Sequence, residues 1–96
     1  MKTKKLQNRL LYYLKRLRQD TRKYDAFGAL VSGSKPISTL FYDVTTKRYF
    51  SNSIVTYQEL SKEFKCSRQY VWEIISRVKA LLPAEMKEYL EDLDKE

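Results

Sequence analysis

The chain has 96 residues, a formal net charge of +7 and an apolar fraction of 43%, a profile typical of one small folded domain and not of a disordered tail. It contains no His and a single Cys, which excludes the usual zinc sites, His-dependent nucleophile pairs and an intrachain disulfide. With only two Gly there is no glycine-rich phosphate loop, so we expect no enzymatic activity, no cofactor and no metal site.

The sequence also bears on location. No apolar run approaches the ~18–20 residues that a membrane-spanning helix needs, and the basic N-terminus lacks the apolar stretch and cleavage site of a signal peptide. The lone Cys66 suits a reducing compartment. We therefore expect a cytoplasmic protein that does not bind a membrane.

The N-terminal segment, residues 1–32, is basic. Residues 1–23 contain nine Lys and Arg and one acid, whereas residues 83–96 contain six acids and two Lys. Apolar side chains at helical spacing predict an amphipathic helix over 5–19; they are Leu6, Leu10, Tyr13, Leu14 and Leu17. We interpret the cations outside this stripe as contacts to phosphate groups, the alternative being a solvated helix face; they are Lys4, Lys5, Arg9, Lys15 and Arg16.

The middle of the chain is less clear. Tyr24, Phe27, Leu30 and Val31 fit a second short helix within 21–32, and residues 32–36 predict a loop that acts as a hinge. For 37–51, the apolar spacing fits a helix, but the Thr, Val and aromatic residues favour strands. We predict a β-hairpin with strands near 38–44 and 47–51, and a helix is the alternative.

Residues 56–82 predict a helix-turn-helix. Thr56 and Glu59 have the spacing of a capping box, and Ser67 is a good N-cap for the second helix. Ser61 is small where the two helices must pass closely. The apolar residues of the second helix predict its buried stripe: Val71, Ile74, Ile75, Val78, Leu81 and Leu82.

The polar side chains of the second helix then face outward. Arg68 offers a bidentate fork for guanine and Gln69 one for adenine. The predicted base-reading residues are Ser67, Arg68, Gln69, Trp72, Glu73 and Ser76, and those predicted to contact phosphate are Lys65, Tyr70 and Arg77. A structural helical hairpin without DNA contact is the alternative. The last segment, 83–96, predicts a short acidic helix after Pro83.

The run Thr56-x-x-Glu59-Leu60-Ser61-x-x-Phe64-x-Cys66-Ser67-Arg68 resembles the helix-turn-helix of sigma-factor region 4 and of small bacterial and phage regulators. A second resemblance, carried by Phe41 to Thr46 and Phe50, is to the hairpin-plus-helix-turn-helix modules of homing endonucleases. In these families the residues after the turn contact DNA. The chain departs at Lys65, where the family usually has Gly, and it has no room for the core-binding helices of a complete sigma factor.

We therefore expect a mainly α fold with a small β-hairpin and a helix-turn-helix core, all in one domain. The expected function is sequence-specific binding of double-stranded DNA in transcription regulation, by a homodimer on half-sites paired by symmetry. The alternative is a protein–protein module, for example a phage-type inhibitor of a host nucleic-acid enzyme.

Overall fold

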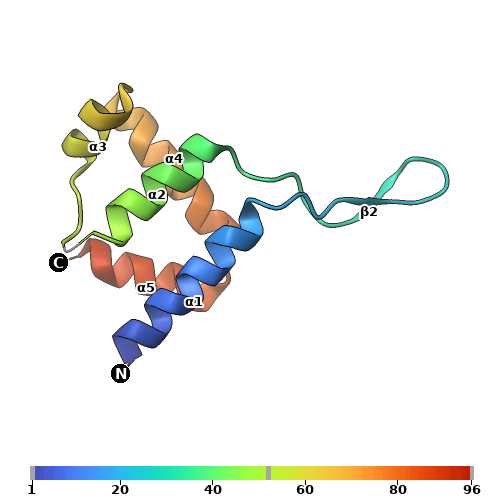
Figure 1. The fold of residues 1–96 in the computed structure, drawn as a ribbon, viewed down its shortest axis with the longest axis horizontal. Coiled ribbons are helices and arrows are strands. Elements are labelled where there is room, and N and C mark those ends of the chain that lie inside the picture. Colours follow the sequence, from blue (N-terminus) through green and yellow to red (C-terminus); the bar gives the residue numbers. More distant parts are fainter. Residues whose placement is uncertain (1, 52, 96) are drawn as a thin grey trace.

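The computed structural model describes residues 2–51 and 53–95. Within these ranges the chain forms five helices and one two-stranded antiparallel hairpin (Figure 1). In chain order the elements are α1 (Lys2–Leu17), β1 (Lys23–Tyr24), β2 (Leu30–Ser32), α2 (Thr39–Tyr49), α3 (Tyr57–Phe64), α4 (Arg68–Leu81) and α5 (Ala84–Asp94). The expected mainly α fold with a small hairpin is confirmed, but the hairpin is not where the sequence placed it.

The short helix predicted within 21–32 is wrong, because this segment is the hairpin. Asp25 holds the tip, where one carboxylate oxygen accepts the amides of Phe27 at 2.8 Å and Ala29 at 3.0 Å. Gly28 has a φ of 82° at the tip, a conformation that glycine adopts without strain. At the base of the hairpin, a Cβ on Gly33 would lie 1.8 Å from the carbonyl oxygen of Thr21. The two backbone segments therefore approach too closely for any residue other than glycine.

The β-hairpin predicted for 37–51 is also wrong, because residues 39–49 form α2. The Ser38 hydroxyl caps the helix by accepting the amide of Phe41 at 3.2 Å. The hydroxyls of Thr45 and Thr46 donate to carbonyl oxygens one turn earlier, at 2.8 Å and 3.0 Å, so these strand-favouring residues are accommodated inside a helix. Burial of Val44 in the core outweighs their local preference.

The core lies between the helices, with α4 in the middle. α4 packs against α2, α3 and α5, and α1 packs against α5. The buried apolar residues are Leu10, Leu14, Val44, Tyr49, Leu60, Val71, Ile74, Ile75, Val78, Leu82, Met86 and Leu90. Figure 1 shows the hairpin projecting from the helices at the end of the molecule opposite α3.

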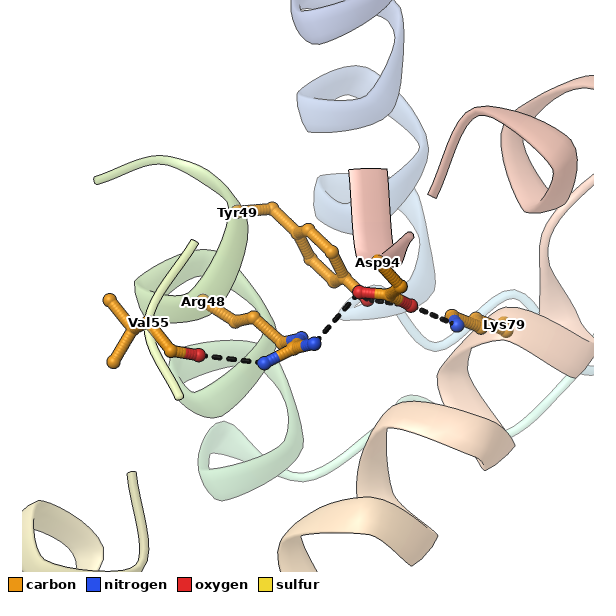
Figure 2. A network of polar contacts seen from close by, with 5 residues as sticks. All are labelled: Arg48, Tyr49, Val55, Lys79 and Asp94. Atoms are coloured by element: carbon orange, nitrogen blue, oxygen red, sulfur yellow. Dashed lines mark hydrogen bonds and ion pairs between the residues drawn. The ribbon is translucent and has the colours of Figure 1, made fainter. Parts of the chain in front are cut away.

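A polar network joins the ends of α2, α4 and α5 (Figure 2). The Asp94 carboxylate accepts from Arg48 Nη2 at 2.8 Å, from the Tyr49 hydroxyl at 3.1 Å and from Lys79. Arg48 Nη1 donates to the carbonyl oxygen of Val55 at 2.7 Å. Burial raises the pKa of Tyr49, and the negative charge of Asp94 acts in the same direction. The acidic helix is thus fixed to the body by a carboxylate near its C-terminal end.

Candidate nucleic-acid interface

α3 begins directly after Thr56, as the capping-box spacing predicted. The Thr56 hydroxyl accepts the amide of Glu59 at 3.1 Å. Among the described residues only this half of the reciprocal capping pair forms. Leu60 is fully buried and Phe64, one turn later, is half-buried, so one face of α3 is anchored in the core.

The turn after α3 contains a residue in the left-handed conformation, which favours glycine. Lys65 has a φ of 55° and a ψ of 49°, and it is the one residue other than glycine with a positive φ in the described chain. The left-handed backbone conformation of this lysine costs on the order of 1 kcal/mol of stability relative to glycine. The Ser61 carbonyl oxygen accepts the amides of Lys65 and Cys66, and the Ser61 hydroxyl donates to the carbonyl oxygen of Cys66. A small polar residue at Ser61 therefore closes the turn.

α4 starts at a side-chain cap and is anchored along one stripe. The Ser67 hydroxyl accepts the amide of Tyr70 at 3.0 Å. The predicted stripe is confirmed except at Leu81, which is 53% exposed. The helix ends at this residue, and Leu82, in extended backbone, turns inward in its place and is 8% exposed.

The opposite face of α4 is open. Trp72 is 50% exposed and Tyr70 37% exposed. Glu73 and Ser76, on the same face, are half-buried. The remaining predicted residues are exposed: Ser67, Arg68, Gln69 and Arg77. Neither α1 nor α5 covers the first turns of α4, and Figure 1 places both helices on the other side of the body from α3.

A surface hollow lies where α3 and α4 meet. Its lining residues are Tyr57, Ser67, Arg68, Gln69 and Trp72. Four of them belong to the predicted base-reading set, which the structure therefore brings together. Tyr57 is not among the residues predicted from the sequence, although its position directly after the Thr56 cap places it in the first turn of α3.

The cations around this face are free of carboxylate partners. Among the described residues, no ion pair involves Lys65, Arg68 or Arg77, and all three side chains are exposed. Their charge is therefore available to an anionic ligand.

The predicted phosphate contacts on α1 are not brought together with the start of α4. α1 packs on α5, and Arg9 Nη1 pairs with Glu85 Oε1 at 2.7 Å. Arg16 donates to the Tyr12 hydroxyl at 3.0 Å and lines a separate hollow with Leu81, about 20 Å along α4 from Arg68 at 1.5 Å per residue. Lys4, Lys5 and Lys15 are exposed. The chain thus carries two separate cationic areas.

Neither a metal-binding cluster nor a membrane-spanning helix is found in the described part of the chain. No three His, Cys, Asp or Glu side chains gather there as a metal site would require. None of its helices combines the length and apolarity needed to cross a bilayer.

Comparison with protein-family models, with curated proteins and with solved structures found no match, so the function is inferred from the residues of the site.

Proposed function

We propose that the protein is a sequence-specific double-stranded DNA-binding protein, a small transcription regulator of bacterial or phage type, which inserts the first half of α4 into the major groove. The observation that carries this proposal is that α4 has one face open to solvent while its other face is packed in the core. Arg68 and Gln69 are exposed in the first turn of α4, while Val71 and Ile74 on the reverse face are fully buried. A rigid helix that presents forked polar side chains fits the groove of a duplex.

The individual side chains have distinct roles in this proposal. Arg68 donates to the N7 and O6 atoms of guanine, and Gln69 donates to N7 and accepts from the N6 amino group of adenine. Each such pair discriminates against a wrong base by about 1–3 kcal/mol. Glu73, half-buried on the same face, accepts from a cytosine amino group.

Phosphate groups on either side of the groove are contacted by Lys65 and Arg77, with the Tyr70 hydroxyl as a neutral donor. These contacts position the helix without reading sequence. The α1 cations reach only flanking phosphates or those of a neighbouring site. Two copies on paired half-sites would add the contacts that one short helix lacks.

We further propose that the protein has no catalytic role and acts in the cytoplasm, where its lone thiol stays reduced.

The test is a titration of labelled duplexes at several salt concentrations. Dissociation constants are measured for the wild type, Arg68→Ala and Arg16→Ala on a preferred duplex and on a scrambled one. We expect affinity to fall with salt, with a log–log slope of roughly −2 or steeper. Arg68→Ala should lose about 5- to 150-fold on the preferred duplex and little on the scrambled one. Arg16→Ala removes the same charge from an exposed site and should weaken both duplexes alike.

Two results would contradict the proposal. One is absence of duplex binding at low salt. The other is equal loss on both duplexes for Arg68→Ala, which would make Arg68 a phosphate contact with no part in reading bases.

The second candidate function is a protein–protein module, and the hairpin favours it. We call residues 20–36, which include β1 and β2, the hairpin arm. Its large apolar side chains are exposed: Tyr24 by 54%, Phe27 by 96%, Leu30 by 55% and Val31 by 61%. Apolar side chains gathered on a projection are typical of a surface that contacts another protein. Copurification of a protein that is lost with Phe27→Ser, together with absence of duplex binding, would support this candidate over the first.

A further inference from the structure

The hollow between α3 and α4 is lined by two aromatic side chains together with polar and cationic ones. Tyr57, half-buried, comes from α3, and Trp72, 50% exposed, comes from α4. Ser67, Arg68 and Gln69 complete the lining. Two aromatic side chains thus meet polar and cationic groups at a concave surface on the face proposed to enter the groove.

The Tyr57 ring is held in place by Arg48. The guanidinium carbon of Arg48 lies 4.2 Å from the centroid of the Tyr57 ring. Arg48 is itself fixed by the Val55 carbonyl oxygen at 2.7 Å and by Asp94 at 2.8 Å (Figure 2). The network that joins α2, α4 and α5 therefore also positions the Tyr57 side of the hollow.

The major groove displays few groups that suit such a surface. Its base edges present hydrogen-bond donors and acceptors, and the one apolar group is the 5-methyl group of a pyrimidine, normally that of thymine. Gln69 and Trp72 are three residues apart on α4 and so lie on the same face of the helix. A methyl group in contact with the Tyr57 and Trp72 rings leaves Gln69 and Arg68 free to bond neighbouring base edges.

We infer, on the basis of the proposed function, that this hollow holds the 5-methyl group of a pyrimidine and that Trp72 and Tyr57 determine specificity at that base. Burial of one methyl group changes affinity by about fourfold. The hollow adds a preference for one methylated pyrimidine beside the bases read by Arg68 and Gln69.

The experiment uses the full-length chain and the duplex that it selects from a random pool. Each thymine of that duplex is replaced singly by deoxyuridine, which lacks only the methyl group, and each cytosine singly by 5-methylcytosine. Dissociation constants are measured for the wild type, Trp72→Ala, Trp72→Gln and Tyr12→Ala. Trp72→Gln keeps a long side chain and removes the aromatic wall. Tyr12→Ala removes a 54% exposed tyrosine of α1, away from the hollow.

For the wild type and for Tyr12→Ala, we expect one deoxyuridine position to lose about fourfold in affinity. In both Trp72 variants the thymine and deoxyuridine duplexes should bind equally at that position. A gain of similar size at one 5-methylcytosine, lost in the same variants, would support the inference with cytosine as the base. Equal binding of all methylated and unmethylated duplexes by the wild type overturns it while leaving the proposed function intact, as does a methyl effect that persists without Trp72. Failure to select any duplex overturns both.

Discussion

In both the helix-turn-helix and the hairpin arm, side-chain oxygens cap backbone amides, but the two regions are anchored differently. Hydroxyls of Thr56 and Ser67 cap α3 and α4, and the Asp25 carboxylate caps the tip of the arm. α3 and α4 then bury an apolar stripe, whereas the apolar side chains of the arm remain exposed. The arm is held by its own strand pairing and by bonds at its base, such as Ser34 amide to Thr21 Oγ1 at 3.0 Å. Local polar contacts set the shape of both regions, but only the first is stabilised by the core.

The largest expected effect contrasts the two regions directly. Leu60→Ala removes a fully buried side chain of α3 and should lower the free energy of unfolding by about 2–5 kcal/mol. Phe27→Ala removes a larger side chain that is 96% exposed and should change it by less than about 0.5 kcal/mol. Urea denaturation followed by circular dichroism measures both. A cost for Phe27→Ala approaching that of Leu60→Ala would mean that the arm packs on a surface after all.

A second variant tests whether the helix-turn-helix depends on α5. Asp94→Asn removes the charge that Arg48 and Lys79 share, both of which are largely buried, and should cost about 3 kcal/mol because the Arg48 cation is left unpaired. Asp92→Asn changes an exposed residue of the same turn and is the control, with little expected change. Thermal unfolding of both variants gives the comparison. Equal melting temperatures would show that the network contributes nothing to stability.

The smallest expected change in the free energy of unfolding concerns the turn between α3 and α4. Lys65→Gly removes the strain of a left-handed lysine and should raise the free energy of unfolding by about 1 kcal/mol. Gly28→Ala in the arm puts a side chain at a φ of 82° but should barely alter global unfolding, because the arm is not part of the core. Denaturant titration resolves the two. A loss of stability in Lys65→Gly would indicate that the lysine side chain makes a contact worth more than the strain.

The helix-turn-helix could be predicted because its signals are local. The Thr56 and Ser67 caps mark where two helices begin, and the spacing from Val71 to Val78 marks the buried stripe; the structure agrees on both. Leu81 was assigned to the stripe because spacing alone does not reveal where a helix ends.

The other segments could not be predicted in the same way, because tertiary burial decided them. Residues 39–49 contain strand-favouring side chains, yet Val44 and Tyr49 are buried and the helix prevails. Residues 23–32 show helical spacing with nothing to pack against, and Asp25 with Gly28 makes a turn instead. Both turn-forming residues, Asp25 and Gly28, are present in the sequence, but the apolar spacing around them indicates a helix.

The candidate site was predicted in part. The exposed residues of α4 follow from its periodicity, but Tyr57 joins them only because α3 and α4 fold against each other. Nor does the sequence reveal that Arg48 and Asp94, 46 residues apart, meet behind Tyr57. Long-range polar contacts of this kind leave no periodic pattern.

The most direct test of the central claim, that the open face of α4 reads duplex DNA, is selection of bound duplexes from a random pool by the wild type and by Arg68→Ala. We predict that the wild type enriches a defined sequence containing a guanine whose preference disappears in Arg68→Ala. Pools that remain random after repeated rounds with the wild type, at a salt concentration low enough for binding, would contradict the claim.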